Sequence, residues 1–341
     1  MPPAMKRLAL AFLLLLTSTG CPKAVDKITL NRVIDRGRQI EDLGQACALG
    51  SSFRHALDAA GTKKRPPHKA LIVAETTSGL CSQLDAWDAE LAEARVRSNP
   101  ASDPVAKANA IRDARVELGR ANTLAAARFY RAWQHMEPAF GEIGGNKCPR
   151  IKKRDEVAYL LGMVSGMLAM LHDGAGGGNV AVPLDTLAIV SRASSCLDDA
   201  DWWNTPRSLE LAQWATIPGS GPEGVDAWAE LELSAAAGDL SGVRVARALQ
   251  ILVAANSGRS DVVTSGIEAH VKSIEATPRD NDWALLDEYA TRISGQQADL
   301  IWTEARGYRS ATFGELPKEP EPVEENNDPD PFGEADPFGG E

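Results

Sequence analysis

The chain has few histidines, and it has no excess of positive charge. None of its five histidines belongs to a recognisable nucleophile, metal-binding or general-base motif. These histidines are His55, His68, His135, His172 and His270. The formal net charge is −11, whereas nucleic acids and anionic lipid surfaces attract basic proteins. We therefore expect a binding protein with no nucleic-acid partner and no metal, and an enzyme of unknown chemistry is the less favoured alternative.

Alternating apolar and polar residues, the pattern of a half-buried strand, are scarce in this sequence. Apolar residues recur at helical spacing almost throughout, and hydrophobic residues make up 44% of the chain, which is ample for a packed core. We therefore predict an all-α fold. Short helices paired by glycine-containing turns predict an array of antiparallel hairpins of the tetratricopeptide (TPR) type, with degenerate repeats because the roughly 34-residue consensus does not recur cleanly.

Long apolar runs are also few. The run Leu8–Leu16 has nine residues, whereas a helix that spans a bilayer needs about 20. Lys6 and Arg7 precede the run and small residues follow it, so that residues 1–20 have the three-part plan of a secretion signal. We predict export, and an oxidising compartment for the rest of the chain.

The end of this signal resembles the cleavage and lipid-attachment site of bacterial lipoproteins. It reads Thr17-Ser18-Thr19-Gly20-Cys21, with Ser18 where that family usually has leucine. The resemblance implies that residues 1–20 are removed and that a lipid is attached to Cys21, with no other cofactor expected. Because several acyl chains anchor a protein stably, we expect the protein to face the periplasm from the outer membrane. An ordinary signal with a chance cysteine is the alternative.

The segment from Val157 to Leu171 contains no charged residue and is expected to be the central helix of the core. At about 15 residues it is too short to span a bilayer comfortably. Gly162 and Gly166 lie on one side of this helix, where they would permit a close approach by a neighbouring helix. No other segment after the signal is predicted to cross a membrane.

Four cysteines follow Cys21, an even number that fits disulfides in an exported protein. They are Cys47, Cys81, Cys148 and Cys196. Helices over 26–60 and 67–97 would form a hairpin in which Cys47 and Cys81 lie level, 13 and 14 residues from the connecting loop. We predict that these two are bonded, and Cys148 and Cys196 by elimination. A zinc site is disfavoured because no two cysteines have the close spacing of a zinc ribbon.

The remaining boundaries follow from capping signals. Asn99–Pro104 ends the N-terminal hairpin, so residues 21–98 are separated from a helical body over 99–314. This body begins with a long helix to about Gly141, and a further helix is predicted over Pro183–Leu197.

Acidic and aromatic residues gather at one point of this body, from Asp198 to Trp203. The spacing does not match the helix-loop-helix calcium motif. We expect the carboxylates to cap the next helix, and Trp202 and Trp203 to pack into a groove between helices. Tryptophans in such a groove would also suit a small apolar ligand, which is the alternative to a protein-binding function.

Residues 315–341 form an acidic, proline-rich tail with ten carboxylates against Lys318, for a charge of −9. This composition predicts disorder. The tail repeats one motif, first as Asp330, Pro331 and Phe332 and then as Asp336, Pro337 and Phe338. Two copies of an aromatic anchor would raise the avidity for a partner protein, although such a repeat also arises by drift in a solvating tail.

Three stretches of the body resemble the T component (TatT-like) that is associated with tripartite ATP-independent periplasmic (TRAP) transporters. They are Ala125–Tyr130, Cys196–Trp203 and Trp283–Arg306. The resemblance covers roughly residues 105–310, whereas the cysteine hairpin and the acidic tail depart from the family. It implies a periplasmic lipoprotein with a TPR-like body that engages a solute-binding protein, a transporter subunit or another envelope protein. A homo-oligomer is one form in which such a protein could act. It carries over no catalytic residue.

Overall fold

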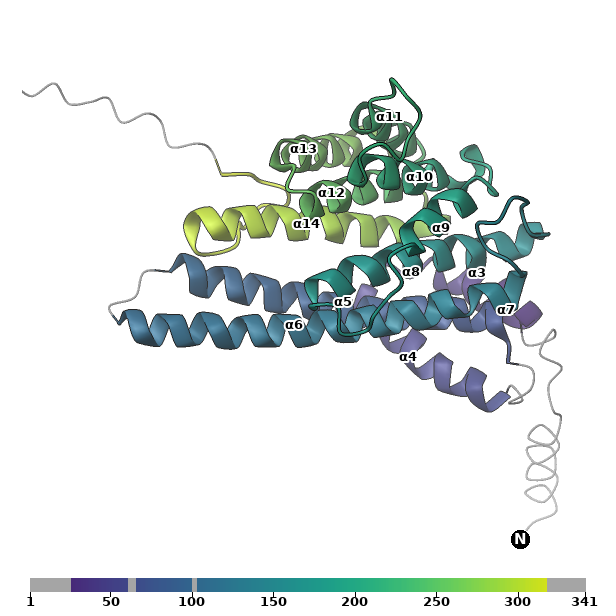
Figure 1. Ribbon diagram of the computed structural model, residues 1–341, viewed down its shortest axis with the longest axis horizontal. Helices are drawn as coiled ribbons and strands as arrows, with labels where there is room; N and C mark the ends of the chain where they lie inside the picture. Colours follow the sequence, from purple (N-terminus) through teal and green to yellow (C-terminus); the bar gives the residue numbers. More distant parts are fainter. Residues whose placement is uncertain (1–25, 61–65, 100–102, 318–341) are drawn as a thin grey trace, which may run out of the picture.

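The computed structural model describes residues 26–60, 66–99 and 103–317, and every regular element within these ranges is helical (Figure 1). The predicted all-α fold is confirmed. The predicted signal over 1–20, the lipid site at Cys21, and the tail beyond residue 317 with its two motifs lie outside the described residues.

The α-helices differ widely in length. In chain order they are α3 (Ile34–Gly37), α4 (Leu43–Ala60), α5 (His68–Ser98), α6 (Pro104–Gln134), α7 (Met136–Phe140), α8 (Glu156–Ala175), α9 (Thr186–Ser194), α10 (Thr205–Thr216), α11 (Ala227–Asp239), α12 (Val245–Asn256), α13 (Ser260–Ala276) and α14 (Ala284–Arg306). Shorter turns of 3-10 or π type are η1 (Thr29–Val33), η2 (Lys153–Asp155), η3 (Ala200–Trp202) and η4 (Asn281–Trp283).

The first predicted helix, over 26–60, is divided in two. Helix α3 ends at Gly37, and α4 begins at Leu43 after a short loop. Two hydrogen bonds account for the break. The carbonyl of Arg38 accepts from the backbone N–H of Leu285, at 2.9 Å, and the Asp42 carboxylate caps α4 by accepting from the N–H of Gln45, at 3.1 Å. The segment before α4 therefore lies across the body instead of continuing the hairpin.

The long helix that was expected to reach Gly141 also breaks earlier. Helix α6 ends at Gln134, and the short α7 follows. Pro138 explains this, because proline has no N–H to donate to the carbonyl of Gln134 four residues before it. The helix that was predicted over 183–197 is shorter as well, at Thr186–Ser194.

Helix α8 is the central element, as its composition predicted, although it is longer than expected. Together with η2 it covers Lys153–Ala175, which is long and apolar enough to cross a membrane. However, 72% of its most apolar 18-residue stretch is buried inside the protein. Helices α5, α6 and α9 pack against it. Gly162 approaches Met136 of α7, and Gly166 approaches Trp133 of α6 and Val190 of α9, which confirms the predicted close approach at both glycines.

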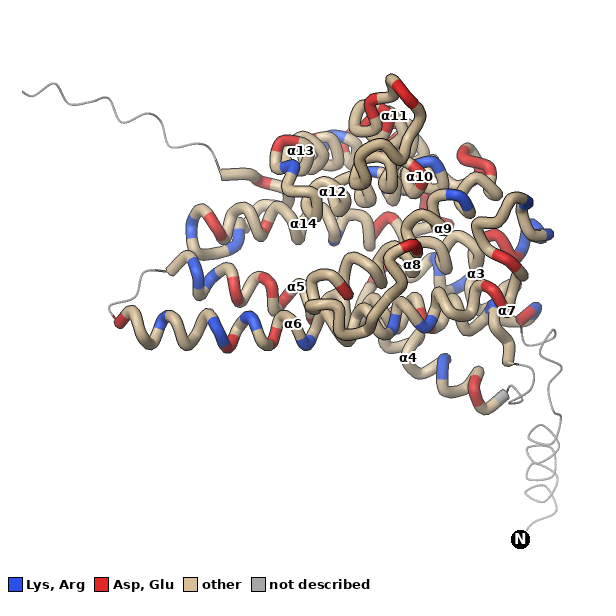
Figure 2. The backbone as a smooth tube through the Cα atoms, viewed as in Figure 1, with Lys and Arg blue, Asp and Glu red and all other residues tan. Residues whose placement is uncertain are grey.

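The C-terminal helices stack as paired layers. From α8 to α14 each helix packs on the next, and α10, α12 and α14 also pack on one another in a row. The helices of this row start about 40 residues apart, a longer unit than the roughly 34 residues of a TPR. Helix α14 ends the row and packs against α5, and α5 in turn runs beside α6 (Figure 1). Charges of both signs alternate along α6 (Figure 2). The N-terminal segment, α5 and the body thus share one apolar core.

Gly166 provides a test of this packing. A Cβ atom there would lie 2.7 Å from the Trp133 ring and 3.0 Å from Val190 Cγ2, whereas one at Gly119 in α6 would meet nothing within 4 Å. Gly166→Val is expected to lower the free energy of unfolding by about 1–3 kcal/mol through overpacking. The matched Gly119→Val should change it by less than about 0.5 kcal/mol. Denaturant titration of both variants measures the difference, and equal values would contradict the packing of α8 on α6.

Candidate functional site

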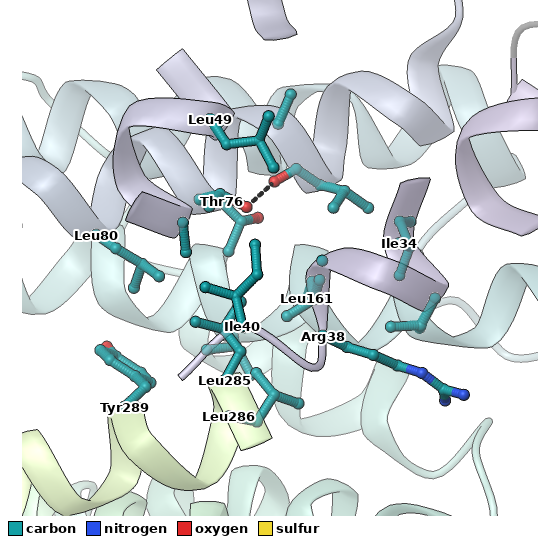
Figure 3. A pocket seen from close by; sticks show the side chains of 18 of the residues that line it. Ile34, Arg38, Ile40, Leu49, Thr76, Leu80, Leu161, Leu285, Leu286 and Tyr289 are labelled. Carbon is teal, nitrogen blue, oxygen red and sulfur yellow. Dashed lines mark hydrogen bonds between the residues drawn. The ribbon is translucent and has the colours of Figure 1, made fainter. Parts of the chain in front are cut away.

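An apolar pocket opens between the N-terminal segment over 29–40 and α4 on one side and α5, α8 and α14 on the other (Figure 3). The empty space between its walls, counted out to the solvent, is about 1120 Å³. Much of this space is open solvent, and the volume that the centres of water-sized molecules can occupy is about 110 Å³. Of the 25 residues that line the pocket only Arg38 is charged.

Two helices supply one face each, and the helical repeat explains both. Val73, Thr76, Thr77 and Leu80 of α5 line the pocket, as do Val157, Leu161, Val164 and Leu168 of α8. Residues three and four apart share one side of a helix, so both sets are continuous stripes. The sequence predicted that this helix belongs to the core, and Val157, Val164 and Leu168 are indeed buried there; the same residues also line the pocket.

Helix α4 forms the outer wall and is tied to α5 by cysteines. Cys47 of α4 and Cys81 of α5 lie at disulfide distance, with Cα atoms 5.2 Å apart. Gly50 also brings the two helices close, because a Cβ there would lie 2.6 Å from Thr77 Cβ. The second pair, Cys148 and Cys196, has Cα atoms 5.4 Å apart and joins the loop before α8 to the end of α9. The structure therefore has the two pairings that the spacing predicted.

The polar side chains of the pocket are mostly bonded to the protein. Thr76 Oγ1 donates to the Ile72 carbonyl and also contacts Ser165 Oγ, each at 2.7 Å, and Thr77 Oγ1 donates to the carbonyl of Val73. The Tyr289 hydroxyl donates to Gln83 Oε1 at 2.5 Å, and its burial raises the pKa of Tyr289. The walls thus present mainly carbon to a ligand.

Three tryptophans meet at one end of the pocket. The ring centroids of Trp202 and Trp203 are 5.5 Å apart, and that of Trp283 lies 5.5 Å from the first and 4.7 Å from the second, all edge to face. Trp202 and Trp203 are buried, as expected. Trp203 and Trp283 line the pocket, whereas Trp202 Nε1 donates to Glu156 Oε2 at 3.0 Å.

Backbone conformation directs this cluster. Trp203 has φ 52° and Asn204 has φ 58°, in the left-handed region that bulky side chains rarely adopt. The sequence placed Trp202 and Trp203 in a groove and Trp283 on the last buried helix face, but nothing in it indicated that the three rings meet. The acidic segment provides a cap, but for the short η3 before the next α-helix. Asp198 Oδ1 accepts hydrogen bonds from the N–H groups of Ala200 and Asp201.

The histidines remain dispersed except for one pair. The Nδ1 atoms of His68 and His135 are 3.0 Å apart, and burial together with the neighbouring His68 lowers the pKa of His135 to about 4. Within the described ranges no group of three or more His, Cys, Asp or Glu residues is placed to hold a metal ion.

His172 is buried with its Nδ1 2.7 Å from Asn122 Oδ1, and its pKa is lowered to about 4 by burial.

A second, polar pocket lies beside His172. Gln83, Glu90, Asn122 and Gln297 also line it, and burial raises the pKa of Glu90. Its empty space, counted in the same way, is about 610 Å³. Leu168 of α8 lines both pockets, so the apolar and polar sites adjoin at this residue.

Comparison of the chain with known protein families, with curated proteins and with solved structures finds no match.

The buried His172 predicts a pH-dependent stability. Because its folded pKa of about 4 lies below the ordinary 6.5, the unfolded chain binds a proton that the folded protein does not. The resulting stability is complete above about pH 6.5 and falls as the pH drops toward 4. His172→Asn should reduce this slope by about 1.4 kcal/mol per pH unit, measured by denaturation across that range. The exposed His55, changed to Asn, is the control and should leave the slope intact.

The Cys47–Cys81 disulfide is expected to hold α4, the outer wall of the pocket, against α5. Cys47→Ser combined with Cys81→Ser is expected to lower the free energy of unfolding by about 2–5 kcal/mol and to free α4 from α5. Binding of an apolar fluorescent probe should weaken in this variant. Changing Cys148 and Cys196 to serine should destabilise the protein without weakening probe binding, since the loop before α8 and helix α9, which this pair joins, contribute no residue to the pocket. Non-reducing peptide maps of the parent should contain both pairs, and a free thiol at Cys47 would contradict the assignment.

Proposed function

We propose that this protein is an exported, lipid-anchored binding protein that takes an apolar small molecule into the pocket between α4, α5, α8 and α14. The observation that supports this is a pocket in which 24 of 25 lining residues are uncharged and most hydroxyl groups bond to the protein itself. The sequence left small-ligand binding as the alternative to a protein-binding scaffold, and the geometry favours the small ligand.

The driving force for such a ligand is the removal of apolar surface from water. Each methylene group that enters an apolar environment contributes about 0.8 kcal/mol, so a chain of six carbons gains on the order of 5 kcal/mol. Association itself costs several kcal/mol in lost freedom of motion, so a micromolar dissociation constant, about −8 kcal/mol, requires the burial of a longer chain or of more apolar surface than six carbons. A disulfide-tied outer wall lowers this cost because it orders α4 before the ligand arrives.

The setting for this function comes from the sequence. The signal-like N-terminus, the lipid site at Cys21 and the resemblance to the T component of TRAP transporters support a periplasmic protein that exchanges its ligand with a solute-binding protein or another envelope protein. The landmark residues Trp202, Trp203 and Trp283, which belong to two of the resembling stretches, meet beside the pocket. A partner that contacted this end of the protein would lie close to the ligand.

The test uses N-phenyl-1-naphthylamine, a neutral apolar probe whose fluorescence rises in an apolar site. The parent protein is expected to bind it with a dissociation constant on the order of micromolar. Leu161→Trp, which enlarges a side chain that points into the pocket, should weaken binding at least about tenfold. Leu184→Trp is the matched control, because Leu184 is 90% exposed and does not line the pocket. Equal binding by both variants, with unchanged circular dichroism, would refute the assignment of the site.

A further inference from the structure

Arg38 has an unusual place at the apolar pocket, because it is the one charged residue among the 25 that line it. Its backbone is fixed where α3 ends, since its N–H donates to the carbonyl of Ile34, at 2.8 Å, and its carbonyl accepts from Leu285, at 2.9 Å. Figure 3 shows its side chain extending away from Leu161 and Leu286, toward the edge of the pocket. The arginine is therefore held at the rim by the main chain, independently of what its guanidinium binds.

The guanidinium is only partly used by the protein. Its ion pair is with Asp35, at 3.7 Å, and the Asp35 side chain is about half exposed. Its carbon Cζ lies 4.5 Å from the centroid of the Trp283 ring, which orients the flat face of the group. Its Nε is buried and has no hydrogen-bond partner, although the side chain as a whole is 26% exposed. An arginine has five N–H donors, and those on its terminal nitrogens, one of which makes only the 3.7 Å contact to Asp35, leave capacity for a further acceptor oxygen.

The acidic residues near Arg38 are engaged elsewhere. Asp282 accepts from Gln39 Nε2 at 3.0 Å, and Glu41 pairs with Arg279 at 2.5 Å. The long contact to Asp35 is thus the charge interaction that an incoming anion would have to replace. A carboxylate or phosphate oxygen is the acceptor that a guanidinium fork binds best, in bidentate geometry.

We propose that the pocket binds an amphiphile that has one aliphatic chain and an anionic head group, with the chain between α5 and α8 and the head group on Arg38. This inference rests on the proposed apolar-ligand function and specifies its ligand class. A free fatty acid and a single-chain lipid phosphate share this chemistry. The uncharged walls exclude water from the chain, and Arg38 selects the charged end and sets the direction in which the chain enters.

The experiment measures displacement of N-phenyl-1-naphthylamine from the full chain by dodecanoate, dodecyl phosphate and dodecanol at pH 8. Dodecanol has the same chain without the charge. The parent protein is expected to bind at least one of the two anions about tenfold more tightly than dodecanol, because charge-assisted hydrogen bonds form only with the anions. The anion that binds more tightly identifies the source, a carboxylate or a phosphate head group.

Variants at two arginines separate a direct contact from general charge. Arg38→Gln is expected to abolish the preference for the anion while leaving dodecanol affinity within about twofold, and Arg38→Lys should retain part of the preference. Arg36→Gln removes an exposed arginine of the same helix that does not line the pocket, and it should retain the full preference. Probe binding by each variant shows that its pocket is intact.

Two results would overturn the inference, and they differ in what else they overturn. Equal displacement by dodecanol and both anions, or an unchanged preference in Arg38→Gln, would refute the role of Arg38 and leave the apolar site in place. Failure of all three compounds to displace a probe that binds would refute an aliphatic ligand. A probe that does not bind the parent at all would refute the proposed function, and the ligand class with it.

Discussion

Helix α8 imposes the main constraint on this fold, because it has no charged side chain from Val157 to Leu171 and must be covered on every side. Helices α5, α6 and α9 cover most of it, and glycines at 162 and 166 let Met136, Trp133 and Val190 come within contact distance. The apolar pocket lies where this cover is completed by the short helical turns η1 and α3 together with α4 and α14. The pocket is thus a consequence of how the central helix is buried.

The second constraint is the way in which distant parts of the chain meet around that helix. The pocket combines residues from Thr29 to Tyr289, and one end of it is the tryptophan cluster, in which two short 3-10 turns bring their rings together. Buried ion pairs stiffen the neighbouring layers, as Arg244 shows by bonding both carboxylate oxygens of Asp287 at 2.8 and 2.9 Å. A binding site built on such a frame keeps its shape when it is empty, which favours affinity.

Much of the fold could be predicted from the sequence, since the helices follow from apolar spacing and the cysteine pairs follow from the level positions of Cys47 and Cys81. The break before α4 could not, because it depends on a hydrogen bond between Arg38 and Leu285, far apart in the chain. The end of α6 has a local signal in Pro138, which cannot donate a hydrogen bond to the carbonyl of Gln134. Arg38 had none, because an arginine at a helix end looks like any surface residue until the pocket places it among carbon atoms.

The bond between Cys47 and Cys81 has a consequence for when the protein can work. Thiols stay reduced in a cytosol, so in such a compartment α4 would lack its covalent tie to α5. The outer wall of the pocket would then be held by packing alone, and only an oxidising compartment would complete it.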